Sequence, residues 1–318
     1  MGTDASGSAA DGKIVVLGGI NMDLFIEAER FPLPGETFEG DRYYTGGGGK
    51  GANQAIAAAQ LAGPGRVQMV GRVGSDVFGE ELLANFERYG VGHDYVEIGE
   101  GESSGIALIF MDGNRENYVL PVYGANAGCG SKQVEDAVRA MDRASVLLLQ
   151  QEIPLGVSQQ AAAAAAESGL TVILDPGPVR DGAEGLVALA DVLAPNQIEA
   201  EGITGISVEG VESAAVAAGQ IRELGVGIAI VKLGEDGCYV DSEEVTGHFP
   251  APGVDAVATV AAGDAFAGGL AVCLSEGMEL AEAVRFAVAA ASLSVTREGA
   301  QDSMPSRADA EVFVAGLG

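Results

Sequence analysis

Two glycine-bracketed segments decide how this chain folds: Gly46-Gly47-Gly48-Gly49-Lys50-Gly51-Ala52-Asn53-Gln54 and Thr259-Val260-Ala261-Ala262-Gly263-Asp264-Ala265-Phe266-Ala267-Gly268-Gly269. Each segment opens an Ala-rich run that favours helix, and each carries polar side chains where that run begins. The N-terminus of a helix presents backbone N–H groups that attract anions. Because the second segment also places the carboxylate of Asp264 at such an end, the pair predicts that phosphate is handled beside a base, as in a kinase.

After about residue 131, short apolar runs alternate with longer helical runs. Strands are predicted at 145–149, 171–175, 192–195 and 227–232, and the helices between them include 154–168 and 211–224. Earlier in the chain we expect strands at 13–18 and 67–73 and helices at 51–62 and 79–89. This alternation implies an α/β fold of parallel strands joined by crossover helices, with ligands at the carboxyl ends of the strands.

Two further segments, roughly 21–45 and 103–124, do not follow this rhythm. They mix aromatic and charged residues with turn signals such as Pro32-Leu33-Pro34-Gly35 and Asp112-Gly113-Asn114. We therefore expect a small β-sheet lid on a single α/β domain that spans 13–318, after a disordered, Gly/Ser/Ala-rich lead-in at 1–12. Since exposed strand edges tend to be paired, the lid also suggests a homodimer.

The charge balance and composition exclude some classes of protein. The 318 residues include 46 acidic and 17 basic ones, and the net charge of −29 repels nucleic acid. No apolar run is long and uncharged enough to span a bilayer, and three widely spaced cysteines suit a reducing cytosol, so we expect a cytoplasmic protein. The acidity, the scarcity of Lys and the abundance of Ala and Gly resemble halophilic proteins, whose self-repulsion is screened in molar salt, where the Debye length is about 3 Å. An acidic mesophilic protein is the alternative.

Common nucleotide-binding motifs do not explain the first glycine segment. Residues 46–51 satisfy Gly-x-Gly-x-x-Gly, but 41–45 make a poor buried strand before it, so a dinucleotide oxidoreductase rests on a weak match. The phosphate-binding loop Gly-x4-Gly-Lys-Ser/Thr fails because Tyr44 occupies its first glycine and Gly51 its Ser/Thr. Taken alone, the segment is also compatible with a flexible turn before a helix.

Both segments resemble the signatures of the ribokinase-like (PfkB) carbohydrate kinase family, the first through Gly48-Gly49-Lys50-Gly51-Ala52-Asn53-Gln54-Ala55 and the second through Ala261-Ala262-Gly263-Asp264-Ala265-Phe266. The likeness continues in order through 21–23, 31–37, 71–79, 195–201, 232–237 and 295–301, and so covers 13–305. This resemblance implies a three-layer α/β/α fold with a mainly parallel sheet and a small β-sheet lid. The first signature is most similar to that of the members that phosphorylate ribose.

Phosphoryl transfer to a hydroxyl needs a base and a cradle for the moving charge. By resemblance, Asp264 is the base, and Ala261, Ala262 and Gly263 present backbone N–H groups to the transferring phosphate, where small residues leave it room. Since an Asp in water has a pKa of about 3.9, we expect Asp264 to be ionised and ready. Read without the resemblance, Asp264 could equally be a helix cap.

The resemblance also assigns the residues that bind the two substrates. The sugar-binding positions match Asn21, Asp23, Gly49, Lys50, Asn53 and Glu152, together with Asp264. The nucleotide-binding positions match Asn196, Lys232, Gly234 and Gly237, and Glu199 is expected to act on Mg²⁺ through water. From the residues alone, Glu152 could be a solvated loop residue, and Asn196 with Glu199 a capping pair.

Three positions depart from the ribose-phosphorylating members. Ala258 stands where they have an Asp that ligates an activating monovalent cation, which weakens the expectation of activation by K⁺. The other positions for this ion, several of them acting through carbonyl groups, map to Val260, Ser294, Arg297, Gly299 and Ser303. Lys232 replaces a Thr, as in other sugar kinases of the family, and Val288 replaces a polar residue near the adenine, which predicts looser discrimination of the base.

The function implied is ATP-dependent phosphorylation of the primary hydroxyl of a sugar, first of all D-ribose to D-ribose 5-phosphate. Other members act on ribose 1-phosphate, nucleosides, fructose or 2-keto-3-deoxygluconate, and a non-catalytic sugar- or nucleotide-sensing protein on the same fold is a further alternative. A sensing protein should lose the base or the glycine cradle, yet Asp264 and Gly263 are both present. A phosphorylated substrate would need a basic pocket, which few positive charges could build. We expect a sugar and ATP as partners, with no nucleic acid and no membrane.

Overall fold

The computed structural model describes residues 12–113 and 117–316, so the predicted lead-in lies, except for Gly12, outside the described residues. Within them the strands form two sheets, of nine and four strands. The larger sheet has the order β13-β12-β11-β10-β9-β8-β1-β4-β5 and is parallel except for the pairs β11–β12 and β12–β13. Its strands are β1 (Lys13–Leu17), β4 (Val67–Gly74), β5 (Gly92–Gly99), β8 (Ala144–Leu149), β9 (Thr171–Leu174), β10 (Val192–Leu193), β11 (Ile228–Lys232), β12 (Cys238–Ser242) and β13 (Thr246–Phe249).

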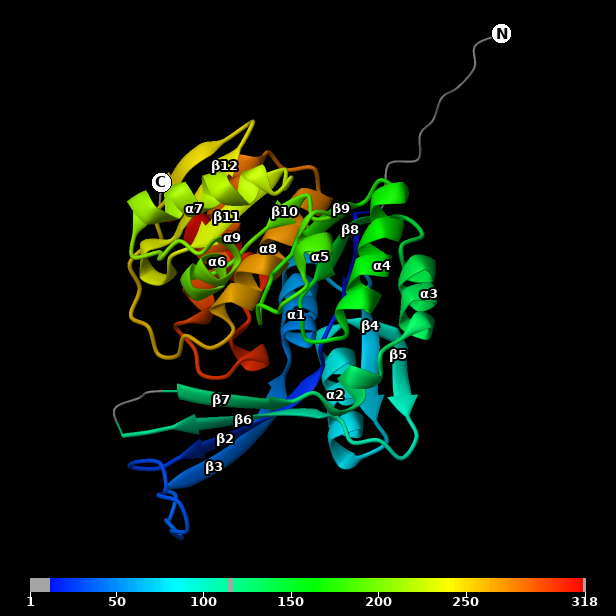
Figure 1. Cartoon of the computed structure of the whole chain (residues 1–318), viewed down its shortest axis with the longest axis vertical. Helices are drawn as coiled ribbons and strands as arrows, with labels where there is room; N and C mark the ends of the chain where they lie inside the picture. The colour runs from blue at the N-terminus through cyan, green and yellow to red at the C-terminus, as the bar shows by residue number, and fades with distance from the viewer. Residues whose placement is uncertain (1–11, 114–116, 317–318) are drawn as a thin grey trace.

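Helices cover both faces of this sheet (Figure 1). Successive residues of a strand point to opposite faces, so Val16 and Leu148 pack in one core cluster, and Leu17 and Leu147 in the other. The first cluster includes residues of α1 (Lys50–Ala62), α2 (Val77–Tyr89), α8 (Ala262–Ser275), α9 (Leu280–Ser294) and α10 (Arg307–Ala315). The second includes residues of α3 (Ser131–Ala140), α4 (Leu155–Glu167), α5 (Glu184–Val187), α6 (Gln197–Thr204) and α7 (Val211–Glu223). This is a three-layer α/β/α arrangement, and it confirms the predicted fold class.

The sequence pattern did not predict the strands at the two ends of the sheet. At one end, β5 carries Asp94 and Glu97 among half-buried residues, and at the other end β13 is half-exposed. Buried parallel strands are recognised by continuous apolar runs, which edge strands lack. The missed elements are therefore those with only one strand neighbour, together with β12 next to β13.

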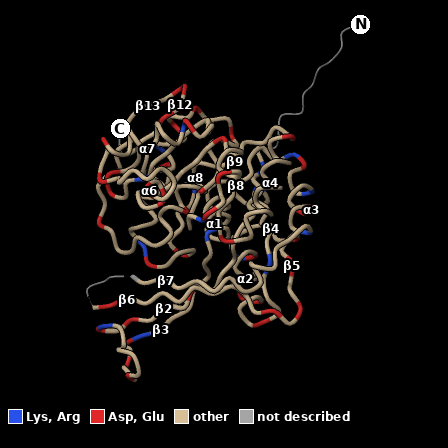
Figure 2. The backbone as a smooth tube through the Cα atoms, viewed as in Figure 1, with Lys and Arg blue, Asp and Glu red and all other residues tan. Residues whose placement is uncertain are grey.

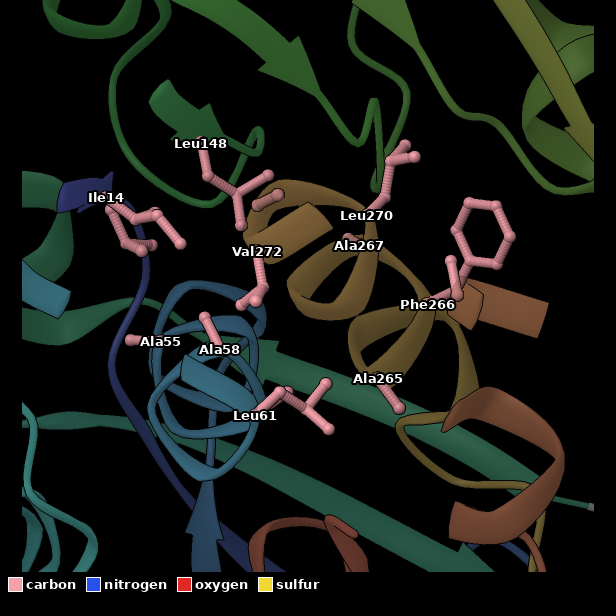
Figure 3. Close-up of a cluster of buried hydrophobic side chains, with 14 of the residues drawn as sticks. Ile14, Ala55, Ala58, Leu61, Leu148, Ala265, Phe266, Ala267, Leu270 and Val272 are labelled. Carbon is pink, nitrogen blue, oxygen red and sulfur yellow. The ribbon is translucent and has the colours of Figure 1, made fainter. Parts of the chain in front are cut away.

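Helices α1 and α8 pack closely against each other over the sheet. A Cβ atom on Gly268 would lie 2.7 Å from Ala57 Cβ and 2.8 Å from Ala58 N, so only glycine allows this approach. Figure 3 shows the two helices side by side, with Ala58 and Leu61 of α1 in the same cluster as Ile14 and Leu148 of the sheet. The small residues that made both segments look helical thus bring the two helix starts together.

The second sheet projects from the main domain (Figure 1) and has the order β3-β2-β6-β7. Its strands are β2 (Asn21–Glu27), β3 (Arg42–Gly48), β6 (Gly105–Met111) and β7 (Asn117–Val122). Phe25 stacks on Tyr44 with ring centroids 4.5 Å apart, in a small apolar cluster of this sheet. The predicted β-sheet lid is therefore present, whereas Asn114 of the predicted turn lies outside the described residues. The division into a lead-in and one domain stays a prediction.

Acidic residues are spread along the whole part of the chain that the structure describes. Figure 2 shows Asp and Glu scattered over the main domain and the lid, where they outnumber Lys and Arg. Across 12–113 and 117–316, no helix has the length and apolarity needed to cross a membrane. Cys129, Cys238 and Cys273 are buried and free, as their spacing predicted.

Candidate active site

A cavity of about 700 Å³ opens beside the start of α8. All four predicted nucleotide-binding residues line it, and so does Val288. Lys50 and the residues from Ala261 to Asp264 line it as well. Pockets of this size hold small-molecule ligands, and this one lies where β11 ends and α8 begins. The two glycine segments therefore meet at a single cavity.

The start of α8 leaves backbone N–H groups open. Ala261 precedes the helix in the left-handed conformation, with φ 60°, which costs a residue with a Cβ about 1–3 kcal/mol. The Ala262 N–H reaches the Thr259 carbonyl only at 3.5 Å. In the described parts of the chain, the N–H groups of Gly263 and Asp264 have no acceptor. Strained backbone and unpaired donors beside a cavity suit an anion.

Asp264 differs from the expectation of a solvated, freely ionised carboxylate. Its side chain is buried, and its two oxygens accept hydrogen bonds from Asn53 Nδ2 and Gln54 Nε2, both at 3.0 Å. Burial raises the pKa of Asp264, although the Lys50 ammonium opposes the rise. The expectation of a solvated carboxylate is therefore wrong, and the environment makes Asp264 a stronger base than a solvated Asp.

The predicted sugar-binding residues gather at the start of α1. Asn21 and Asp23 begin β2 and are buried, and Glu152 follows β8. Glu152 Oε2 accepts a hydrogen bond from the Lys50 backbone N–H at 2.9 Å and lies 3.4 Å from Asn21 Nδ2. Gly49, with φ 85°, allows this meeting, because a Cβ there would lie 2.7 Å from the Asn21 backbone N. These residues therefore form one polar group beside Asp264.

Two features of this polar group point to a hydroxyl-bearing ligand. Asn53 Oδ1 is buried and has no hydrogen-bond donor among the described residues. Burial raises the pKa of Asp23 to about 8, with the charges of Glu152 and Asp264 adding to the rise. Burial likewise raises the pKa of Glu152 to about 7. At neutral pH the group therefore offers both acceptors and carboxyl O–H donors, as vicinal hydroxyls require.

Two lysines that line the cavity form ion pairs with one buried carboxylate, that of Asp175. Lys50 Nζ lies 3.3 Å from Asp175 Oδ1, and Lys232 Nζ lies 2.9 Å from Asp175 Oδ2. Although burial alone would raise the pKa of Asp175, the two ammonium groups hold it below its usual range. Burial alone would lower the pKa of Lys50, but the carboxylates of Asp175, Asp264 and Glu199 raise it. Lys50 is therefore charged.

Asn196 and Glu199 form the capping box that the residues alone suggested. Asn196 Oδ1 accepts from the Glu199 N–H, and Glu199 Oε2 accepts from the Asn196 N–H, both at 2.8 Å. Burial and the nearby Asp175 raise the pKa of Glu199, and its Oε1 lies 3.9 Å from Lys50 Nζ. A carboxylate oxygen outside the cap suits a hydrated Mg²⁺, so capping and metal binding are compatible.

The positions predicted for a monovalent cation lie near the start of α8 and around the end of α9. Ala258 supplies no carboxylate, and its N–H, like that of Val257, donates to the Val295 carbonyl. The other predicted positions are distributed as follows: Val260 precedes α8, Ser294 ends α9, Arg297 and Gly299 follow α9, and Ser303 lies in a short 3₁₀ helix. The Ser294 carbonyl already accepts from the Arg297 N–H at 3.2 Å. Among the described residues there is no group of three or more His, Cys, Asp or Glu side chains that could hold a metal ion.

Three residues of the site were not predicted as site residues from the sequence: Asp175, Gln54 and Asn126. Asp175 follows a buried strand at its carboxyl end, which is a recognisable signal. Asn126 is fully buried and bonds to the Ile20 N–H, the Ile20 carbonyl and Asn21 Oδ1. It therefore holds the start of β2 in place. Nothing in the local sequence singles out Asn126, because its partners lie more than 100 residues away.

Comparisons with known proteins agree with this geometry. Residues 11–307 match the pfkB family of carbohydrate kinases. The chain is 35% identical to a ribokinase of Haemophilus influenzae over 95% of its own length and 98% of the relative, and 34% identical to a deoxyribokinase of Salmonella typhi over 92% and 95%. It is similar to the structure of Arabidopsis thaliana ribokinase in complex with ribose and ATP, with a TM-score of 0.84, 35% identity and coverage of 95% and 98%. The chain therefore belongs to the pfkB family of carbohydrate kinases.

Proposed function

We propose that this kinase transfers the γ-phosphoryl group of ATP to the primary hydroxyl of D-ribose, giving D-ribose 5-phosphate. One observation carries the proposal. The buried carboxylate of Asp264 lies between a polar group that suits hydroxyls and the unpaired N–H groups that open the nucleotide cavity. A base placed between these two regions can act on a hydroxyl at the point where phosphate arrives.

The polar group orients the sugar. Asn53 Oδ1 accepts from one hydroxyl, and the protonated carboxyl of Asp23 donates to another. Asn53 Nδ2 and Gln54 Nε2 hold the Asp264 carboxylate, so its orientation is set before the sugar binds. A site that pairs with hydroxyls in this way rejects analogues that lack them, because its own buried groups would be left unpaired.

Asp264 takes the hydroxyl proton as the sugar oxygen bonds to the γ-phosphorus and the bond to the leaving ADP oxygen breaks. The N–H groups of Gly263 and Asp264 hold the charge that develops on the phosphoryl oxygens. Lys50 and Lys232 face the same cavity with fixed positive charge. Glu199 would hold Mg²⁺ through water, and the ion would neutralise charge on the phosphates.

A neutral sugar suits the site better than an anionic one. Asp23, Glu152 and Asp264 lie close enough that each carboxylate disfavours ionisation of another. These carboxyl groups offer no positive charge to pair with the phosphate of ribose 1-phosphate or the carboxylate of 2-keto-3-deoxygluconate, so these alternatives are disfavoured. The Haemophilus influenzae and Arabidopsis thaliana relatives support ribose, and the Salmonella typhi relative makes 2-deoxyribose the second candidate.

The test is a substrate panel with ATP: ribose, 2-deoxyribose, ribose 1-phosphate, nucleosides, fructose and 2-keto-3-deoxygluconate. We expect kcat/KM to be highest for ribose, with 2-deoxyribose lower by at least about tenfold because it leaves a buried group unpaired. Phosphorus NMR of the product should place the new ester on the primary carbon. A preference for an anionic substrate, or no turnover with any of these compounds, would contradict the proposal.

The lid supports a homodimer. Tyr43 of β3 and Leu120 of β7 are 80% and 64% exposed, and an apolar face of this kind is typical of an interface. Light scattering should give twice the mass of the 318-residue chain, and Leu120→Lys should lower it. A monomer at micromolar concentration would contradict the pairing.

The acidic surface supports a protein of a salt-rich cytoplasm. With a net charge of −29, added salt should screen repulsion and raise the melting temperature. Melting scans from 0.1 to 2 M KCl test this, and a melting temperature that did not change with salt would contradict it.

A further inference from the structure

Asp175 is the most enclosed charged group of the site. It directly follows β9 and is completely buried. Its Oδ1 lies 3.3 Å from Lys50 Nζ and accepts a hydrogen bond from the Gly177 N–H at 3.2 Å, while its Oδ2 lies 2.9 Å from Lys232 Nζ. Both oxygens therefore have donors, and the carboxylate cannot rotate without losing one of them.

The two lysines come from different elements of the fold. Lys50 is the first residue of α1, and Lys232 is the last residue of β11. Both line the cavity together with the start of α8. Lys232 Nζ lies 3.3 Å from the position that a Cβ on Gly263 would occupy, so this ammonium is next to the open N–H groups. The phosphate end of a nucleotide held by those N–H groups would meet Lys232 directly.

We infer that Asp175 is a positioning residue, which holds Lys50 and Lys232 at the start of α8 where they contact the phosphoryl group in transfer. The inference rests on the proposed function and extends it to residues that bind the transferred group. It gives a role to Lys232, which stands where the ribose-phosphorylating members have Thr. Asp175 itself does not touch the substrate in this arrangement.

The two lysines depend on Asp175 to different degrees. Lys50 has a second carboxylate nearby, since Glu199 Oε1 lies 3.9 Å from its ammonium. For Lys232, Asp175 is the only acidic group of the described residues within 4.0 Å. Without Asp175, the Lys232 ammonium would keep only the more distant Glu199 and an incoming phosphate as counter-ions.

This dependence predicts an unusual split between binding and turnover. A freed ammonium can still attract a bound nucleotide, so the ground state does not lose affinity. The ammonium would, however, no longer be fixed in the place that the transition state requires. The rate would fall, because only interactions that are stronger in the transition state than in the ground state accelerate the reaction. Loss of Asp175 should therefore lower kcat without weakening nucleotide binding.

The first variant is Asp175→Asn, which keeps the shape and the acceptor for the Gly177 N–H. We expect kcat with ribose to fall about 10- to 100-fold, as misplacement by about 1 Å does, while Kd for the non-hydrolysable analogue AMP-PNP is unchanged or lower. The matched control is Asp136→Asn. Asp136 of α3 is also buried and bridges two cations, Lys132 at 2.7 Å and Arg139 at 3.0 Å, but it does not line the cavity. Its variant should keep kcat and Kd.

The inference is overturned if Asp175→Asn keeps kcat within about twofold of the wild type, or if it loses affinity for AMP-PNP and adenosine alike. Should Asp175→Asn fail to fold, Asp175→Asn/Lys232→Met removes both members of the pair and avoids an unpaired buried charge. That variant should fold and bind adenosine normally, with weaker AMP-PNP binding and a lower kcat. Wild-type kcat in it would overturn the inference.

Failure of the proposed function can be told apart from failure of this inference. If the wild type phosphorylated no sugar, the proposed function would fall, but nucleotide affinity could still be measured. Lys232→Met should then weaken AMP-PNP binding by about tenfold or more, the worth of a charge-assisted contact of about 1.4 kcal/mol, and leave adenosine binding unchanged. Equal affinities for AMP-PNP in the variant and the wild type would show that Lys232 does not contact phosphate.

Discussion

The starts of α1 and α8 are both rich in Gly and Ala, but their first N–H groups are paired to different degrees. At α1, the Lys50 N–H donates to Glu152 at 2.9 Å and the Ala52 N–H donates to the Gly19 carbonyl at 3.0 Å. At α8, the N–H groups of Gly263 and Asp264 have no acceptor in the described ranges. A helix N-terminus attracts anions in both cases. The first is matched by a carboxylate of the chain itself, and the second is available to the phosphate of a substrate.

Both helices also begin after a residue with positive φ, at 85° for Gly49 and 60° for Ala261. In neither helix does the N-cap residue itself, Gly49 or Ala261, cap the start with a side chain. Glycine at position 49 is required because the backbone of residues 19–21 lies against it. The non-glycine residue at 261 holds a strained conformation, which is typical of a functional site. In the proposed function, the start of α1 organises the residues that bind the sugar, and the start of α8 receives the phosphoryl group.

The largest expected effect comes from removing the charge of Asp264 at the start of α8. Asp264→Asn keeps the shape and places an amide where the base stood. We expect kcat to fall about 10²- to 10⁴-fold, the usual contribution of a positioned general base, in a coupled assay of ADP release. The affinity for AMP-PNP should change little, because the N–H groups of α8 remain. Turnover close to the wild type would remove Asp264 from the mechanism.

The second prediction sets one glycine of each helix start against the other. In Gly51→Ala, the new Cβ would lie 2.7 Å from the Gly18 carbonyl carbon and 2.8 Å from the Gly19 N, both backbone atoms that cannot move aside. We expect a loss of about 2 kcal/mol or more in the free energy of unfolding, measured by denaturant titration.

In Gly263→Ala, the Cβ would instead lie 3.3 Å from Lys232 Nζ, the end of a flexible side chain. Folding should therefore be preserved, while kcat falls about tenfold as Lys232 and the incoming phosphate are displaced. The comparison fails if Gly51→Ala is as stable as the wild type, or if Gly263→Ala is the less stable of the two.

The sequence was sufficient to predict the frame of this site but not its chemistry. Gly263, Asp264 and Lys50 could be chosen because small residues and a carboxylate at helix starts follow from local pattern. The parallel strands were predicted from their apolar runs, whereas the edge strands β5 and β13 were not, because their residues are half-exposed. The state of Asp264 could not be predicted, since its pKa depends on burial by α1, more than 200 residues away. Asn126 was missed for the same reason: its contacts are long-range.

The third prediction concerns Glu152, the carboxylate that completes the start of α1. Glu152→Gln keeps one acceptor for the Lys50 N–H but removes the charge that faces it. We expect KM for ribose to rise about tenfold and kcat to change less. The reason is that a charge-assisted hydrogen bond contributes up to about 1.5 kcal/mol more than a neutral one. An equal loss in kcat and kcat/KM would assign Glu152 to the transition state instead.

The same residue gives a stability test with a defined sign. Folding raises the pKa of Glu152 to about 7 and that of Asp23 to about 8, from 4.5 and 3.8. The folded state therefore binds more protons, so this contribution is fully present below about pH 4 and is lost as pH rises through 7 to 8. The melting temperature of the ligand-free protein should fall between pH 5 and pH 9, with a smaller fall in Glu152→Gln. Parallel curves for the two proteins would contradict the assignment.

The smallest expected effect concerns the loop before α8. Ala258 and Val257 fix this loop through the Val295 carbonyl, at 3.1 and 2.7 Å, and no carboxylate stands at 258 to hold a cation. We therefore expect kcat in KCl and in choline chloride of equal ionic strength to differ by less than about threefold, below the about 1.4 kcal/mol that a tenfold change represents. Ala258→Asp should raise the response to K⁺, because the new carboxylate adds an anionic ligand beside the open helix start, whereas Ala258→Asn controls for side-chain size without the charge. Strong activation of the wild type by K⁺ would mean that carbonyl groups alone can hold the ion, and the open start of α8 would then depend on a cation as well as on its own N–H groups.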